Sequence, residues 1–199
     1  MRLIESRYFQ VFICFIFMVS QLSFGQENDS ASITIQTEIG DIKAVLYLKK
    51  APLTCLNFLS YIDQAGKEGG TFYRTVTMDN QPDKKVKIEV IQGGFDISKL
   101  DSTKIRAIPL ERTNETGIPH LNGTLSMARD DPDSGTTEFF ICVSDQPSLD
   151  FGGARNPDGQ GFAAFGRVTE GMDIVRRIQS SHAEEQKLSP PIKIIRIYR

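Results

Sequence analysis

The residues that most often carry out catalysis or bind metals are sparse in this chain. Its two histidines, His120 and His182, have no cysteine or aspartate at metal-ligand spacing. No serine or cysteine stands in a recognisable nucleophile motif with a partner base. The segment from Asp131 to Gly135 lacks the fifth- and sixth-position residues of a calcium-binding loop. If the chain is an enzyme, we therefore expect chemistry that uses neither a cofactor nor a covalent intermediate.

One segment combines polar turn residues with an aromatic pair. Residues 123–144 read GTLSMARDDPDSGTTEFFICVS, in which two runs of strand-like composition flank a stretch rich in Asp, Ser and Thr. Side chains alternate between the two faces of a strand, so Phe139 and Phe140 should point in opposite directions. The segment is either a plain β-hairpin with both rings in the core or a groove wall with one ring facing a ligand.

The N-terminal residues differ in composition from the rest of the chain. Arg2 and Arg7 precede an apolar run from Val11 to Val19. Ser23-Phe24-Gly25 follows, with small residues at Ser23 and Gly25, where a signal peptidase would need them. The run is shorter than the about 20 apolar residues of a membrane-spanning helix. Residues 1–25 are therefore predicted to be a cleaved secretory signal, with an uncleaved membrane anchor as the alternative.

The remaining chain has the composition of one folded domain. We expect residues 26–31 to be a disordered lead and residues 32–199 to form a single domain. Hydrophobic residues make up 40% of the sequence and the net charge is −2, which allows a core but gives no basic footprint for nucleic acid. The predicted location is exported, periplasmic or secreted. The predicted state is a monomer without stable membrane insertion once the signal is cleaved.

Cys55 and Cys142 are the cysteines that remain after signal cleavage. An exported protein could pair them in a disulfide. Each, however, lies within an apolar run, which is typical of a buried free thiol. We expect two buried thiols.

Hydrophobic periodicity predicts about eight strands and two helices. The expected strands are residues 32–37, 42–48, 72–76, 86–92, 123–128, 138–143, 163–168 and 192–198. One helix opens around Pro52, which suits a first turn, and ends near Gly66; a short amphipathic helix spans 174–178. Many short strands with Gly and Pro turns indicate a β-barrel or sandwich, in which the first and last strands could pair.

Several motifs occur in a fixed order along the chain. They are GTFYRTV (70–76), IQGG (91–94), GTLSMAR (123–129), EFFI (138–141) and GFAAFGRVTEGMD (161–173), preceded by APLT (51–54) with Asn57 and Phe58. Together they resemble a cyclophilin-type peptidyl-prolyl cis-trans isomerase of the bacterial style, from about Thr34 to Tyr198. The resemblance implies a mainly β fold, a closed eight-stranded antiparallel β-barrel capped by two α-helices. It also implies a groove that binds proline-containing polypeptide segments and speeds their cis/trans interconversion without a cofactor.

The resemblance implies two catalytic residues. Arg74 follows Phe72 and Tyr73 as the family's catalytic arginine follows its aromatic pair. Its implied role is to donate to the substrate carbonyl and to polarise the prolyl nitrogen. Gln92 matches the glutamine that hydrogen-bonds the substrate backbone and braces the arginine. Without the resemblance, Arg74 would be interpreted as a surface arginine and Gln92 as a strand-end residue before a glycine turn.

Seven further positions match residues that bind the substrate in the family. They are Val90, Met127, Ala128, Arg129, Phe140, Leu149 and Phe162. Phe140, Leu149 and Phe162 correspond to the proline pocket, and residues 127–129 to the stretch whose backbone pairs with the extended peptide. The polar segment that follows would then be a loop at the edge of the groove.

The spacing between the two catalytic positions departs from the family's pattern. The interval from Arg74 to Gln92 is longer than in the family, and counting back from Gln92 puts Glu89 in a pocket position where phenylalanine is usual. Ile88 could fill that position if the strand bulges. A carboxylate in the pocket would cost desolvation and could pair with Arg74, which would lower the catalytic rate.

Two other departures lie near the same groove. Glu138 replaces a glutamine, which adds a carboxylate. Ser148 stands at the position of a tryptophan found in members that bind cyclosporin strongly, so weak binding of that drug is expected.

The residues leave more than one function open. The first is a prolyl isomerase that assists the folding of exported proteins. The second is a peptide-binding chaperone or scaffold module on the same barrel with little or no isomerase activity, which Glu89 would favour. A third is a structural barrel whose groove is blocked by the loop at 77–86.

Overall fold

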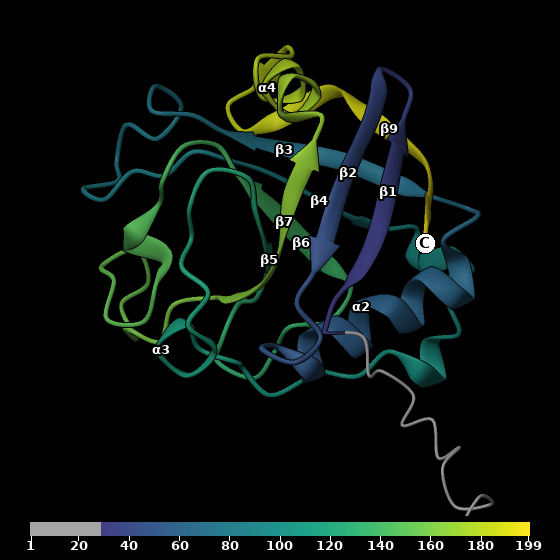
Figure 1. Cartoon of the computed structure of the whole chain (residues 1–199). Coiled ribbons are helices and arrows are strands. Elements are labelled where there is room, and N and C mark those ends of the chain that lie inside the picture. Colours follow the sequence, from purple (N-terminus) through teal and green to yellow (C-terminus); the bar gives the residue numbers. More distant parts are fainter. Residues whose placement is uncertain (1–28) are drawn as a thin grey trace, which may run out of the picture.

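The strands form one antiparallel sheet that closes on itself in the computed structural model, which describes residues 29–199 (Figure 1). The predicted signal at 1–25 and residues 26–28 of the predicted lead at 26–31 lie outside the described residues. The strands are β1 (Ala31–Thr37), β2 (Gly40–Leu46), β3 (Gly70–Val76), β4 (Val90–Phe95), β5 (Thr124–Met127), β6 (Glu138–Cys142), β7 (Ala163–Glu170), β8 (Ala183–Glu184) and β9 (Lys187–Tyr198).

Pairing between β1 and β9 closes the barrel. The strand order is β1-β2-β7-β5-β6-β4-β3-β9-β8, and the additional β1–β9 pairing makes a cylinder of eight strands. The two-residue β8 forms a short hairpin with β9. The predicted closed eight-stranded barrel is therefore confirmed. Closure removes the free strand edges that could otherwise pair with other chains.

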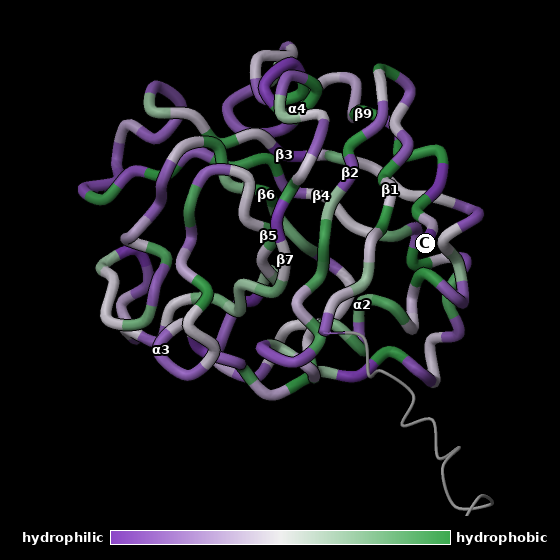
Figure 2. The backbone as a smooth tube through the Cα atoms, in the orientation of Figure 1, coloured by the Kyte–Doolittle hydropathy of each residue, from purple (hydrophilic) through white to green (hydrophobic). Residues whose placement is uncertain are grey.

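Alternation along the strands decides which side chains face the barrel interior. In the β1–β2 hairpin, Ile33, Ile35, Ile42 and Ala44 are at most 2% exposed. The residues between them are more exposed, and Figure 2 shows hydrophobic and hydrophilic positions following one another along both strands. Because side chains on a strand alternate between faces, this sequence pattern puts one face into the core.

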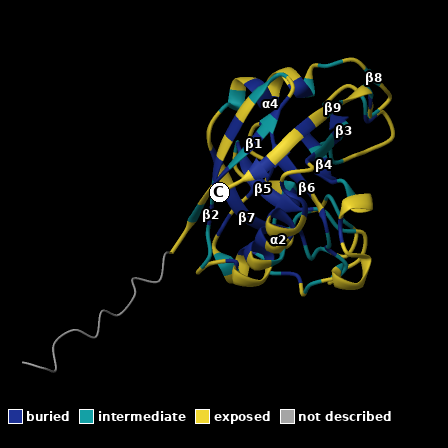
Figure 3. Cartoon of the chain, turned by 90° about the vertical axis from the view of Figure 1, so that its right-hand side faces the viewer, coloured by how far each residue is buried: buried dark blue, intermediate teal, exposed yellow. Residues whose placement is uncertain are grey.

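The two predicted helices cap opposite ends of the barrel (Figure 1). Helix α2 (Pro52–Ala65) begins with proline in its first turn, and α4 (Met172–Gln179) covers the other end. One face of α2 is buried and the other is exposed (Figure 3). From the buried face, the Phe58 ring centroid lies 5.2 Å from those of both Phe139 and Phe165, so the helix seals the core with aromatic contacts.

Short helical turns occur in the connecting loops. The four-residue helix α3 (Thr113–Thr116), which the sequence did not predict, lies in the loop-rich region before β5. Three 3₁₀ helices occupy residues 97–99, 102–104 and 147–149. None of the helices within residues 29–199 is long and apolar enough to cross a bilayer.

The predicted strand at 86–92 is wrong in its bounds, because β4 begins at Val90. Residues 77–89 form a separate folded segment between β3 and β4. The buried side-chain amide of Gln81 organises it: Nε2 donates to the carbonyls of Thr77 (2.7 Å) and Ile88 (2.8 Å). A side chain thus satisfies backbone groups that a neighbouring strand would otherwise pair.

Candidate active site

A groove of about 720 Å³ brings together residues from β3, β4, β6 and the adjoining loops. Eight of the nine residues named from the sequence line it: Arg74, Val90, Gln92, Ala128, Arg129, Phe140, Leu149 and Phe162. The ninth, Met127, is 3% exposed and packs instead with Leu110 and Ala163. The groove is therefore a single concave surface built from segments that are far apart in the sequence.

The floor of the groove is apolar. One buried cluster contains Val76, Ile88, Val90, Phe140, Cys142 and Leu149, with Ala128 and Phe162 packed against it. The ring of Phe162 stands edge-on to that of Phe140, with centroids 5.3 Å apart and planes at 89°. Phe139 is buried on the other side of the strand, against Phe58 in the barrel core. The expectation of one aromatic ring toward the groove and one toward the core is confirmed.

The expectation that Glu89 occupies the pocket is wrong. The groove is lined by Ile88 and Val90, and Glu89 is not among its lining residues. The count from Gln92 matched positions to the family, whereas strand alternation from Gln92 and Val90 puts Ile88, and not Glu89, on the groove side. The apolar Ile88 therefore faces the groove, and no carboxylate enters the recess at this point.

A hydrogen-bonded chain lies behind the aromatic floor. His120 Nδ1 is 2.7 Å from Asp150 Oδ1, and His120 Nε2 is 2.9 Å from Ser126 Oγ. The imidazole also stacks on Phe140, with ring centroids 6.0 Å apart and planes at 14°. His120 is 1% and Ser126 0% exposed, so this Ser–His–Asp chain has no access to a substrate. It supports the Phe140 ring from behind.

The guanidinium of Arg74 is held at the rim of the recess by two glutamines. Nη1 donates to Gln92 Oε1 at 2.7 Å, and Nε and Nη2 donate to Gln186 Oε1 at 3.0 and 2.7 Å. A guanidinium has five N–H donors, so two remain without a partner among the described residues. Burial lowers the pKa of Arg74, although nearby Tyr73 and Glu138 act against that shift. The side chain keeps its charge and has free donors.

The amide of Gln92 links this arginine to a carboxylate. Its Nε2 donates to Tyr73 Oη (2.7 Å) and to Glu138 Oε2 (3.0 Å), and Tyr73 Oη donates to the same carboxylate oxygen at 2.6 Å. Because Arg74 can only donate, the carbonyl end of Gln92 must face it, and the orientation of the amide is fixed. Burial, and then the hydrogen bond to Glu138, raise the pKa of Tyr73, so the phenol stays protonated.

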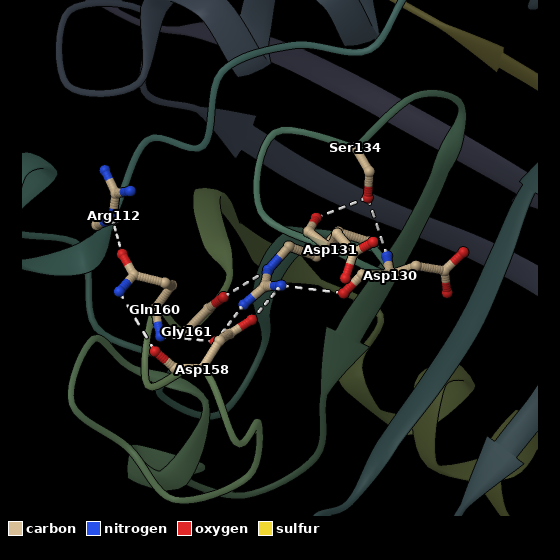
Figure 4. Close-up of polar contacts among 8 residues, drawn as sticks. Arg112, Asp130, Asp131, Ser134, Asp158, Gln160 and Gly161 are labelled. Carbon is tan, nitrogen blue, oxygen red and sulfur yellow. Dashed lines mark hydrogen bonds and ion pairs between the residues drawn. The ribbon is translucent and has the colours of Figure 1, made fainter.

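Arg129 has a different environment in the same groove, and Figure 4 labels two of its partners, Asp158 and Gly161. Its Nη1 and Nη2 donate to the two oxygens of Asp158 at 2.8 and 3.0 Å, and Nε donates to the Gly161 carbonyl at 2.8 Å. The guanidinium lies 5.1 Å from the centroid of the Phe162 ring. The Asp158 carboxylate also accepts from the backbone N–H of Gln160 at 2.8 Å. Arg129 thus ties the loop before β7 to the end of β5.

Two side chains that shape the groove could not be identified from the sequence. Gln186 lies 112 positions after Arg74, yet its amide oxygen binds that guanidinium. Arg155 Nη1 donates to Gln81 Oε1 (2.9 Å) and to the Val86 carbonyl (2.7 Å), which fixes the 77–89 segment against the groove. Both contacts depend on loop placement, so neither periodicity nor a local motif could have found them.

The remaining titratable groups offer no second reactive centre. Cys55 and Cys142 are free and buried, as expected, and burial raises the pKa of the Cys55 thiol to about 12. Burial also raises the pKa of the Cys142 thiol. Within residues 29–199, no group of three or more His, Cys, Asp and Glu side chains is arranged to hold a metal ion.

Comparison with protein families gives one match over the described domain. Residues 32–199 match the family described as cyclophilin type peptidyl-prolyl cis-trans isomerase/CLD. A peptidyl-prolyl cis-trans isomerase of Acinetobacter baylyi is 33% identical over 171 residues, which cover 83% of each chain. Peptidyl-prolyl cis-trans isomerase B of Escherichia coli is 33% identical over 149 residues, 74% of this chain and 83% of the relative.

Solved structures show the same fold. A cyclophilin-type peptidyl-prolyl cis-trans isomerase of Cryptosporidium parvum superposes with a TM-score of 0.66 at 21% identity, covering 84% of this chain and 96% of that one. A second structure of that protein, obtained in the presence of the dipeptide Ala-Pro, gives a TM-score of 0.65. At this identity the likeness concerns the barrel architecture.

Proposed function

Because this chain belongs to the family of cyclophilin-type peptidyl-prolyl cis-trans isomerases, we propose that the groove beside Arg74 is where it accelerates rotation about Xaa–Pro bonds. One observation carries the assignment. A charged guanidinium with two free N–H donors lies at the rim of an apolar recess, and its partners are neutral amides. This combination suits a substrate with an apolar ring next to a polar amide.

The reaction requires that resonance in the imide bond be weakened. Rotation about a peptide bond has a barrier of about 18–20 kcal/mol, and uncatalysed X–Pro exchange takes about tens to hundreds of seconds. In the twisted state the nitrogen lone pair is no longer delocalised into the carbonyl. A donor directed at that nitrogen stabilises the twisted state more than the planar one, which is the condition for catalysis. No covalent bond breaks, so the reaction needs no nucleophile.

Each part of the groove has a role in this proposal. The recess floored by Phe140 and walled by Ile88 and Phe162 receives the proline ring, and burial of apolar area holds it. Arg74 supplies its free donors to a carbonyl of the substrate and to the prolyl nitrogen. Gln92 fixes the arginine, and it donates to the substrate backbone by exchanging one of its bonds to Tyr73 and Glu138 for the substrate carbonyl. A rate gain of about 10⁵ would require about 7 kcal/mol of preferential binding to the twisted state.

The binding-module alternative rested on a carboxylate in the pocket. Since Ile88 rather than Glu89 lines the groove, that motivation is gone. The open volume of the groove likewise gives no support to a barrel blocked by residues 77–86.

The catalytic assignment is tested by substitution of Arg74. We expect Arg74→Ala to lower kcat/KM for a short Ala–Pro peptide by about 10²–10³-fold, as for other preorganised donors. NMR exchange spectroscopy measures the rate without a coupling protease. Arg176→Ala, at an exposed arginine on α4, is the matched control and should leave the rate unchanged. A wild-type rate in Arg74→Ala would refute the assignment.

We further propose that the protein is exported and acts on exported polypeptides. The support is the order of cationic, apolar and small residues in the first 25 positions. Expression in a bacterial host and mass measurement of the recovered protein test this. Loss of about 25 residues and recovery from the periplasm are expected; a full-length cytoplasmic product would contradict it.

A further inference from the structure

Gln186 lies in the two-residue turn of the β8–β9 hairpin, directly beside Arg74. Its backbone carbonyl accepts from the Thr75 N–H at 2.9 Å, so the turn is fastened to β3 one residue from the arginine. Its side-chain oxygen accepts from both Nε and Nη2 of Arg74. One edge of the guanidinium is therefore fully engaged with this one amide, while the free donors belong to Nη1 and Nη2.

The other end of the Gln186 amide is fixed by the 77–89 segment. Gln186 Nε2 donates to the Asn80 carbonyl at 3.1 Å. Asn80 Nδ2 in turn donates to the carbonyls of Thr75 and Glu185, each at 3.0 Å. Asn80 thus clamps β3 to the hairpin turn. Both ends of the Gln186 amide have partners, which sets its orientation and leaves the oxygen toward Arg74.

The chemistry of this partner matters as much as its position. A carboxylate in the same place would form a bidentate ion pair and offset the positive charge that the proposed reaction uses. A neutral amide restrains the guanidinium to one geometry without adding a negative charge beside it. The geometry points to Gln186 as a positioning residue for Arg74, held in place by the segment between β3 and β4. This inference rests on the proposed catalytic role of Arg74.

Two substitutions at Gln186 distinguish the effect of the position of the Arg74 guanidinium from the effect of its charge. Gln186→Ala removes the acceptor, and we expect kcat to fall by about 10–100-fold with a much smaller change in KM, because a misplaced catalytic group affects mainly the chemical step. Gln186→Glu retains an acceptor but adds a negative charge. We expect it to lower kcat as well, with partial recovery as the pH falls and the new carboxyl is protonated. Gln64→Ala on α2 is the matched control and should be neutral.

The side-chain NMR signal of Arg74 reports the hydrogen bond itself. We expect a protected Nε–H resonance in the wild type and in Gln186→Glu, and its loss in Gln186→Ala. If Gln186→Ala fails to fold, the pH profile of Gln186→Glu decides. A wild-type kcat in Gln186→Ala, or a pH-independent rate in Gln186→Glu equal to that of the wild type, would overturn the inference. Failure of the catalytic proposal is recognised separately, by a wild-type rate in Arg74→Ala.

Discussion

The two arginines that line the groove have opposite kinds of partner. Arg129 faces the carboxylate of Asp158 through two hydrogen bonds, and its side chain is 1% exposed. Arg74 faces the amide oxygens of Gln92 and Gln186. The same side chain is therefore paired with a carboxylate at one position in the groove and with amides at the other. The partner, more than the arginine, decides whether the cation is available to a substrate.

The difference in partners also indicates different roles, structural for Arg129 and chemical for Arg74. Arg129 binds the Gly161 carbonyl and covers the Phe162 ring, so most of its contacts hold the loop before β7 in place. Arg74 has two N–H groups left over, and we assign those to the substrate. Four experiments test this contrast between the two arginines.

The largest effect is expected from giving Arg74 a charged partner. Gln92→Glu in a Glu138→Gln background places a carboxylate against the guanidinium without a like charge beside it. We expect kcat/KM to fall by about 100-fold, because the charge at the prolyl nitrogen is offset. The Glu138→Gln single variant is the control and should stay within about threefold of wild type. A double variant as active as this control would show that the charge of Arg74 is not what the reaction uses.

For stability, in contrast to activity, loss of Arg129 should have a larger effect than loss of Arg74. Arg129→Ala loses a bidentate ion pair, a bond to the Gly161 carbonyl and the contact with Phe162. We expect its Tm, measured by circular dichroism, to fall by more than that of Arg74→Ala, since a buried, multiply bonded arginine contributes packing as well as charge. An equal loss of Tm in both variants would contradict a larger structural role for Arg129.

The Arg129–Asp158 ion pair should also make the stability of the fold depend on pH in acid. The hydrogen bond from Arg129 lowers the pKa of Asp158. A carboxyl whose folded pKa is depressed stabilises the fold above its unfolded pKa of about 3.9 and loses that contribution as the pH falls through the folded value. At neutral pH the free energy of unfolding, measured in urea, should therefore be higher for the wild type than for Asp158→Asn. The two free energies of unfolding should become equal as the pH falls below about 4 and Asp158 becomes protonated. A difference between them that does not change with pH would contradict the ion pair.

The smallest effect is expected at the outer end of the Arg74 network. Tyr73→Phe removes the donor to Glu138 and the acceptor for Gln92, but leaves both glutamine bonds to Arg74. We expect kcat/KM to fall by about two- to threefold, which is the worth of one net hydrogen bond. Because the pKa of Tyr73 is raised, the wild-type rate should show no step near pH 10, where an ordinary tyrosine ionises. Such a step, absent in Tyr73→Phe, would give the phenol a larger role.

Much of the fold could be predicted because its signals are local. Alternation in β1 and β2, proline at the start of α2 and opposite faces for Phe139 and Phe140 each depend on a few neighbouring residues. The pairing of the two proposed catalytic side chains was also accessible. Their motifs lie on adjacent strands, where Arg74 is the register partner of Gln92.

The prediction failed where positions were matched to the family across an interval of different length. Glu89 was assigned to the pocket by counting back from Gln92, yet Ile88 lines the groove together with Val90 and Gln92. Side chains two residues apart on an extended chain share a face, so alternation favours Ile88 at this position. The buried amide of Gln81, which binds the Ile88 carbonyl, holds this segment in place.

Residue types and their order along the chain were enough to predict the barrel, its two caps and the residues at the rim of the groove. The partner of each arginine, in contrast, depends on how the chain is packed. Asp158 reaches Arg129 and Gln186 reaches Arg74 from distant loops and turns. A hydrogen bond requires its two atoms within about 3 Å and in the right direction. That geometry is fixed by the packing of the whole barrel, which no local pattern of residue types encodes.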